Sequence, residues 1–521
     1  MRIHPRAAAV VAMAWLLLLT ACTRQHTRDY LKDSEEQLGL LQSWYGSDHR
    51  IFHSALLYPH GRSLIVNGYL VGIEKGDQEK VGGGRNPDAL VTVEKTDTRR
   101  FEDIHGRLTG NRKSHIITHV LRYTTQVRAG GVGRMTQCAL YSAMDGPPGV
   151  IDPGERLFEW CDGPTVVPPG QAFRASWDAI AALRRALSDD LSPKDGPDGS
   201  APAYTHVIVY VMGWNTAQDE ALENFNSLVG HLLDEADSRK VDFRPLVVGV
   251  TWPSLWALGD WSFVPDAIVR GLSFVNKADD AEEVGTTWLR EVVERAVLPA
   301  RDEARRRSSG NGRPGPRVVL VGHSFGARAL VSAITLRAQL LPPDKVTANP
   351  LDDKDRAILL EGAFEIERLF DRSRETAGGA AGRAIRLPEF PAGNPRLTLT
   401  ASVFDSAVGI AVWGWYAGDV GTYDNVCEAA RDGKTWKHFE FSPFGCASAR
   451  NTDDKARYGM PVCAKSGRTG LDVPLAGKTI RYFDASDLIN CNAPFTGGGA
   501  HSDIYRRETA RFILDEILSP P

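Results

Sequence analysis

The sequence lacks long hydrophobic runs, an excess of one charge and closely spaced cysteines. Its longest apolar run, Ala7–Leu19, has 13 residues, or about 20 Å of helix, which is too short to cross a bilayer comfortably. Lys and Arg total 61 against 65 Asp and Glu, so the charge gives no sign of a nucleic-acid partner. None of the 7 cysteines belongs to a Cys-x-x-Cys pair, which argues against a zinc site. No internal repeat or low-complexity tract stands out.

What the sequence does contain is typical of a folded protein. It has 521 residues, of which 42% are hydrophobic and 24% charged. This composition suits a globular chain that buries a large core. At about 150 residues per domain, the length favours two to four domains.

The N-terminus has the pattern of an export signal. Two arginines precede the run Ala7–Leu19 and small residues follow it, so we predict a signal peptide over residues 1–21. The junction Leu19-Thr20-Ala21-Cys22 resembles the lipobox of bacterial lipoproteins. That resemblance implies acylation of Cys22, which would anchor the protein in the cell envelope. Ordinary signal cleavage beside an incidental cysteine is the alternative.

Thr23, rather than Asp, follows the cysteine. By resemblance to bacterial sorting rules, this implies the outer membrane of a Gram-negative cell, with the protein facing the periplasm. Residues 22–60 are expected to form a tether.

Six cysteines remain in the mature chain, and an even number in an exported protein predicts three disulfides. Cys138 and Cys161 are well separated from the others, so we expect them to pair with each other. The other four allow three pairings, between which the sequence does not decide: Cys427, Cys446, Cys463 and Cys491.

The chain divides into two regions with different sequence patterns. Residues 61–170 contain short β-branched runs separated by glycine and polar residues, which predict a β-rich N-terminal region. In residues 171–521, apolar runs alternate with helical patterns, which predicts an α/β domain built on a mainly parallel sheet. The runs expected to form strands there are His206–Met212, Pro245–Val250, Val318–Val321, Ala357–Leu360, Leu397–Val403 and Thr479–Phe483.

Gly322-His323-Ser324-Phe325-Gly326 matches the pattern Gly-x-Ser-x-Gly. An apolar strand precedes it and a helical pattern follows it, which is the strand–serine–helix arrangement of a nucleophile elbow. The glycines permit a tight turn and close packing of the helix on the sheet. We therefore predict that Ser324 is a catalytic nucleophile, and a buried structural serine is the alternative.

Three segments carry a family resemblance: Met212-Gly213-Trp214-Asn215, Trp252-Pro253-Ser254 and the serine motif. Together they resemble the α/β-hydrolases, and in particular a bacterial lipoprotein-type group of that superfamily. The resemblance covers about residues 204–515 and implies an α/β-hydrolase fold with serine esterase or lipase-like chemistry. The group usually has histidine where this chain has Met212, which puts in doubt how the following loop is supported.

A serine hydrolase of this kind needs two N–H donors for the developing oxyanion. The residue after the nucleophile supplies one, and the loop after an earlier strand supplies the other. We assign these donors to the backbones of Phe325 and Trp214. A plain strand-to-helix turn at Trp214 is the alternative.

The triad order in this fold is serine, acid, histidine. Asp405 follows the strand Leu397–Val403 and is the leading acid candidate, supported by a Ser-x-x-Asp-x-Ala pattern that the resemblance implies. Glu361 is the second candidate, followed by Asp484 and Asp487. His501 lies in a glycine-rich loop before the C-terminal helical pattern, and we predict that it is the base; a surface histidine is the alternative.

The resulting expectation is a serine hydrolase of the cell envelope that cleaves acyl esters without a metal or an organic cofactor. Its partners would be the ester substrate and, through Cys22, a membrane; no nucleic acid is expected. Aromatic residues near the strand ends could line an acyl pocket or simply pack beneath loops. Arg328 and Arg305–Arg307 are expected on solvated helix faces. An amidase or peptidase with the same triad, and a non-catalytic binding or scaffold module, are the other functions considered.

Overall fold

The structure is a computed structural model of the chain. The signal peptide, the tether and Cys22 lie outside the residues that it describes. Within the described part of the chain, no helix has the length and apolar character needed to span a membrane. The residues described are 63–77, 91–93, 113–127, 133–143, 159–167, 171–192, 204–216, 218–254, 277–309, 315–335, 338–340, 348–364, 370–371, 384–385, 396–402, 404–405, 407–408, 411–412, 415–416, 418, 462–463, 480–486, 488–492 and 500–519.

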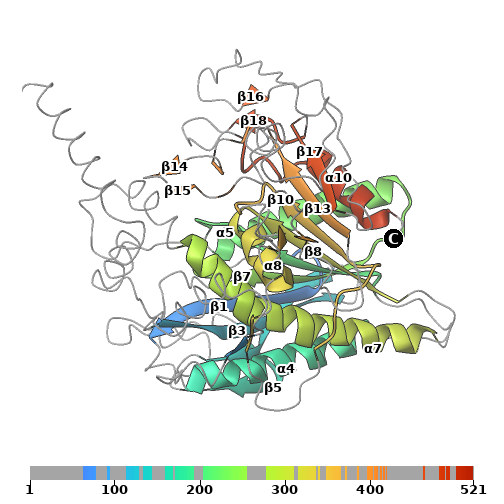
Figure 1. The fold of residues 1–521 in the computed structure, drawn as a ribbon. Coiled ribbons are helices and arrows are strands. Elements are labelled where there is room, and N and C mark those ends of the chain that lie inside the picture. Colours follow the sequence, from blue (N-terminus) through green and yellow to red (C-terminus); the bar gives the residue numbers. More distant parts are fainter. Residues whose placement is uncertain are drawn as a thin grey trace, which may run out of the picture.

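One mixed sheet of ten strands organises the described residues, in the order β17-β13-β10-β8-β6-β7-β1-β3-β4-β5 (Figure 1). From β17 to β1 the neighbours are parallel. The central strands are apolar on both faces, and every residue of β6 and β7 is buried, as expected for a parallel sheet covered by helices. The parallel strands are β6 (His206–Val211), β7 (Pro245–Thr251), β8 (Arg317–His323), β10 (Arg356–Leu360), β13 (Arg396–Ala401) and β17 (Ile480–Asp484).

The β-rich N-terminal region continues this sheet. β1 (Gly68–Asp77) pairs parallel with β7, with Gly68 opposite Val247. β3 (Lys113–Val127) and β4 (Gly133–Ser142) extend the sheet in antiparallel fashion, and β5 (Glu159–Val166) closes the edge. The segment of β5 contains glycine and proline, which are unusual inside strands, so its local sequence does not identify it as a strand.

Helices cover both faces of the sheet. α5 (Gln218–Ser238) packs against α10 (Arg507–Leu518), and α4 (Ala172–Leu191) packs on β3 beside α7 (Leu298–Ser309) (Figure 1). Residues 277–284 are helical and continue through two π-helical stretches into α7. These stretches are η3 (Gly285–Leu289) and η4 (Val292–Val297).

α8 (Phe325–Thr335) begins directly after β8 and packs on η3. The helical pattern after the serine motif extends to Gln339 in the sequence, but the helix ends at Thr335. Ala338–Leu340 instead form β9, which pairs with β2 (Val91–Val93). The remaining short pairs are β11 (Phe370–Asp371) with β12 (Ala384–Ile385), β14 (Ala411–Val412) with β15 (Trp415–Tyr416), and β16 (Val462–Cys463) with β18 (Cys491–Asn492).

The structure contains the expected disulfide between Cys138 and Cys161. It joins the neighbouring edge strands β4 and β5, where Cys138 pairs with Glu159. The bond therefore fixes the last strand of the sheet covalently.

The register of β16 and β18 predicts a second disulfide. Cys463 lies directly opposite Cys491 in this antiparallel pair, and opposite residues have Cα separations of about 4.5–5.5 Å, within the range that a disulfide spans. We expect non-reducing peptide mapping to find Cys463 joined to Cys491, which leaves Cys427 for Cys446. A peptide joining Cys463 to Cys427 or Cys446 would contradict this pairing.

Candidate active site

The predicted site residues lie at the carboxyl ends of adjacent parallel strands. Ser324 follows β8, Gly213 and Trp214 follow β6, and Asp405 comes four residues after β13. The chain reaches His501 after β17 and before α10. In open parallel sheets this edge is where ligands bind, so the topology gathers the predicted residues on the expected side.

The turn at Ser324 is strained and tightly packed. Ser324 has φ +55°, a left-handed conformation that costs a non-glycine residue about 1–3 kcal/mol and is frequent at functional sites. A Cβ on Gly326 would lie 2.3 Å from the Val211 carbonyl oxygen, and one on Gly322 would lie 2.8 Å from the Ala327 nitrogen. Both glycines are therefore required for α8 to start this close to β6 and β8.

The loop after β6 lies against the nucleophile. A Cβ on Gly213 would come within 3.4 Å of the Ser324 Cβ, so the two turns are in contact. The rings of Trp214 and Phe325, the two residues assigned to the oxyanion hole, have centroids 6.0 Å apart. The structure thus brings together the two backbones that were assigned as donors.

The Trp-Pro-Ser segment supports this loop. Trp252 Nε1 donates to the Met212 carbonyl at 2.8 Å. Ser254 Oγ donates to the Thr216 carbonyl and accepts from the Thr216 N–H, and the Ser254 carbonyl accepts from the Asn215 N–H. Buried hydrogen bonds from Trp252 and Ser254 therefore hold the loop after β6. They support it although Met212 stands where the resemblance implied a histidine.

His501 and Asp405 form a hydrogen-bonded pair. Nδ1 of His501 lies 2.7 Å from Oδ2 of Asp405, and Oδ1 of Asp405 accepts from the backbone N–H groups of Ala407 and Val408. Burial raises the pKa of Asp405, but the charge and hydrogen bond of His501 outweigh it and lower the pKa below its ordinary value. Asp405 is therefore an anion that can fix the tautomer of His501.

His323 links the base to the nucleophile turn. Its Nε2 lies 2.8 Å from the His501 carbonyl oxygen and donates to it, and the two rings have centroids 4.7 Å apart. Burial, with His501 nearby, lowers the pKa of His323 to about 3, so this ring is neutral. The sequence reasoning missed this contact, although His323 immediately precedes the serine.

Of the alternative acids, Glu361 lies beside Asp405 rather than replacing it. It follows β10, is fully buried and hydrogen-bonds to the Asp405 side chain. Asp484 ends β17, and Asp487 lies outside the described residues.

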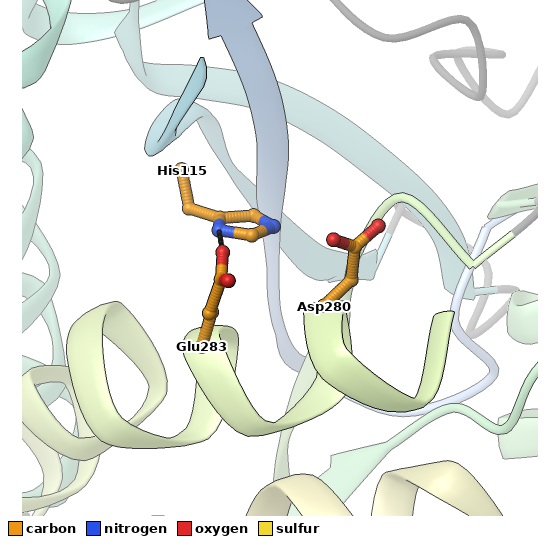
Figure 2. Close-up of side chains that lie close together, drawn as sticks. All are labelled: His115, Asp280 and Glu283. Atoms are coloured by element: carbon orange, nitrogen blue, oxygen red, sulfur yellow. Dashed lines mark ion pairs between the residues drawn. The ribbon is translucent and has the colours of Figure 1, made fainter. Parts of the chain in front are cut away.

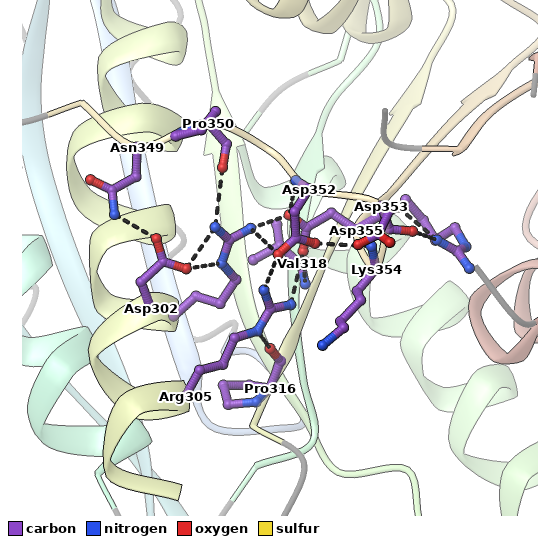
Figure 3. A network of polar contacts seen from close by, with 12 residues as sticks. Asp302, Arg305, Pro316, Val318, Asn349, Pro350, Asp352, Asp353, Lys354 and Asp355 are labelled. Carbon is purple, nitrogen blue, oxygen red and sulfur yellow. Dashed lines mark hydrogen bonds and ion pairs between the residues drawn. The ribbon is translucent and has the colours of Figure 1, made fainter. Parts of the chain in front are cut away.

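Of the arginines expected on solvated faces, Arg306 and Arg307 are exposed as predicted, whereas Arg305 is partly buried and Arg328 is buried. Arg328, four residues after Ser324, is 7% exposed and pairs with Glu282 at 2.5 Å. Arg305 pairs with Asp352 and Asp355 in a network around the start of β10 (Figure 3). The network around Arg305 joins α7 to the amino ends of β8 and β10, at the edge opposite Ser324. It therefore ties the helix to the sheet.

A third polar cluster comprises His115, Asp280 and Glu283, whose ligand-type atoms lie within 4.8 Å of one another. Figure 2 shows the two carboxylates rising from one helical segment toward His115 on β3. Lys75 and Lys277 lie 2.6 Å and 3.0 Å from the two Asp280 oxygens. These ammonium groups balance the charges of Asp280 and Glu283, so we assign an ion-pair network here rather than a metal site.

We expect Asp280→Asn to lower the free energy of unfolding by about 3–5 kcal/mol, because it removes the carboxylate that two buried ammonium groups share. Urea denaturation followed by circular dichroism measures this change. Asp242→Asn, which breaks the exposed pair with Arg244, is the control and should barely move the denaturation midpoint. Equal midpoints for the two variants would rule out an ion-pair core.

Comparisons with protein-family models, with curated proteins and with solved structures each found no match. The function must therefore be inferred from the chemistry of the site.

Proposed function

We propose that this protein is a serine hydrolase with an α/β-hydrolase fold, in which Ser324, Asp405 and His501 form the catalytic triad. The observation that carries the proposal is the His501–Asp405 hydrogen bond of 2.7 Å beside a serine held at φ +55° between a strand and a helix. The strand order and the position of each residue after a parallel strand support the same fold.

The chemistry begins with proton transfer. His501 Nε2 accepts the Ser324 hydroxyl proton while its Nδ1–H remains bonded to Asp405. Ser324 Oγ forms a bond to the carbonyl carbon of the substrate, and the backbone N–H groups of Phe325 and Trp214 stabilise the oxyanion. His501 then protonates the leaving alcohol, and water, activated in the same way, releases the acyl group from Ser324.

The substrate class is an acyl ester, lipid-like or small, at the bacterial cell envelope. The triad suits attack at a carbonyl, and a lipid anchor at Cys22 would hold the site close to lipid substrates and raise their local concentration. Trp252 is buried, whereas Trp256, Trp261, Phe263 and Trp413 lie outside the described residues. An acyl pocket is therefore proposed from the substrate class and the anchor, and not from these aromatic side chains.

Labelling with a fluorophosphonate probe tests the reaction class. We expect the native protein to react once and peptide mass spectrometry to find the adduct on Ser324. Heat-denatured protein, which has lost the assembled triad, is the control and should not react. Absence of labelling, together with no hydrolysis of p-nitrophenyl esters or amides, would favour a binding or scaffold module.

A further inference from the structure

A second buried carboxyl lies behind the triad acid. Glu361 is the residue after β10, and its φ of +44° is a left-handed conformation. Its side chain is 0% exposed. A buried glutamate held at such a backbone angle, beside the candidate triad, requires an explanation beyond packing.

The hydrogen bonds around Glu361 tie it to β13 and to Asp405. Thr400 Oγ1 donates to Oε1 at 3.1 Å, and the Ser402 N–H donates to Oε2 at 3.2 Å. The Glu361 backbone N–H in turn donates to Thr400 Oγ1 at 3.0 Å. The Glu361 side chain also hydrogen-bonds to Asp405, so the two acids share one site.

The position of the shared proton follows from the donors around each acid. Two carboxyl groups can form a hydrogen bond only if one of them carries a proton, and like charges this close do not both ionise. Asp405 accepts from His501 and from two backbone N–H groups, so its anion is well stabilised. Among the described residues, Glu361 receives one hydroxyl and one N–H from its other neighbours. The proton therefore belongs on Glu361.

The remaining titratable groups agree with this placement. His501 faces Asp405 from the turn before α10, and the neutral His323 faces His501 from β8. Burial and the charge of Asp405 raise the pKa of Glu361 well above its ordinary value. The direction of this shift agrees with the donor arrangement, which makes Glu361 the neutral member of the pair.

We propose that Glu361 is a positioning residue that carries a proton and donates it in a hydrogen bond to Asp405, holding that carboxylate in place for His501. This inference rests on the proposed function, because it assigns Asp405 and His501 to the triad. Glu361 touches neither the substrate nor the reacting atoms. It fixes the orientation of Asp405 and, by withdrawing electron density from it, limits how far Asp405 raises the basicity of His501.

Two substitutions test the proposal through the pH dependence of kcat/KM for a p-nitrophenyl ester. E361Q keeps a donor to Asp405, so we expect kcat/KM to fall by no more than about threefold. The acidic limb of the pH profile, which is the fall of kcat/KM at low pH, should not move. E361L removes the donor, so we expect a fall of about 10- to 100-fold. Its acidic limb should move to higher pH, because an Asp405 carboxylate that gives up less charge to a hydrogen bond attracts the imidazolium form of His501 more strongly.

A matched control is available at β13, the strand whose Thr400 binds Glu361. Glu516 is also buried and accepts a hydrogen bond from Thr398 on β13, but it lies on α10 away from Asp405. E516L should therefore lower stability without moving the acidic limb. If E516L moves that limb as E361L does, the pH shift reports general loosening and the proposal is wrong.

Two outcomes for E361Q would also overturn the proposal. If Glu361 is ionised in the native protein, E361Q removes a negative charge and moves the acidic limb to lower pH. If E361Q and E361L lose activity equally, a hydrogen-bond donor is not what the site requires. E361Q decides these cases even if E361L does not fold.

Infrared spectroscopy tests the proton without any assay of activity. Burial also raises the pKa of Glu74, so the readout is the difference between the spectra of native protein and E361Q at neutral pH, in which we expect the C=O band of a protonated carboxylic acid. Absence of that band would refute the proton on Glu361. If the band is present but the native protein neither hydrolyses esters nor reacts with fluorophosphonate, the proposed function fails instead.

Discussion

Ser324→Ala should lower kcat for p-nitrophenyl ester hydrolysis by about four to six orders of magnitude and abolish fluorophosphonate labelling. In the proposed mechanism the substitution removes the atom that bonds to the acyl group, whereas the proposed oxyanion donors on Phe325 and Trp214 are backbone groups and remain. A residual rate above that in water is therefore expected. Steady-state kinetics on purified variant and native protein measures the loss.

The same helix offers a control for this substitution. Ser332 is buried on α8, two helical turns beyond Ser324, and Ser332→Ala should leave kcat unchanged. Both variants should melt close to the native protein, since each loses a single hydroxyl. An undiminished esterase rate in Ser324→Ala, with its fold intact, would remove Ser324 from the mechanism.

His501→Ala should cost about as much as Ser324→Ala, because the hydroxyl is a weak nucleophile without a base. Asp405→Asn should cost about 10⁴-fold, since an amide at the position of Oδ2 favours the wrong tautomer of His501. The measurement is kcat/KM for the single variants and for Ser324→Ala/His501→Ala. If Ser324 and His501 act as a unit, as the proposed triad requires, the double variant should be little worse than either single variant.

If the fold-loss in kcat/KM of the double variant equalled the product of the two single fold-losses, Ser324 and His501 would act independently. His231 on α5 provides a control histidine. Its replacement by alanine should leave kcat/KM at the native value.

Much of the fold was predictable because the parallel strands are short apolar runs between helical patterns. The expected strand His206–Met212 corresponds to β6, and Thr479–Phe483 corresponds to β17 within one residue at either end. β5 was missed because its segment, Glu159–Val166, contains glycine and proline. It is held at the sheet edge by pairing with β4 and by the Cys138–Cys161 disulfide, which are contacts between residues distant in the sequence.

The candidate site was predictable only in part. Motif and strand order bring Ser324, Asp405 and His501 to one edge, and the His501–Asp405 contact lies where the sequence placed it. The role of Glu361 was not visible, because a residue considered as an alternative acid turned out to lie beside the first choice. The hydrogen bonds of Ser254 and the ion pair of Arg328 were not predicted, since their partners lie on other elements and cannot be read from local patterns.

The place of β1 in the sheet has a consequence for how this chain can fold. β1 separates β7 from β3, so the parallel half of the sheet is completed by a strand that precedes it by about 180 positions. Synthesis delivers β1 long before its partner, and such distant pairing slows folding and leaves strand edges exposed in the meantime. A fragment that began after residue 170 would lack β1. It would therefore present the buried strand β7 as an open edge, the kind of surface through which chains aggregate. The N-terminal third is thus a structural part of the molecule that carries the candidate site, and it cannot be removed as a separable module.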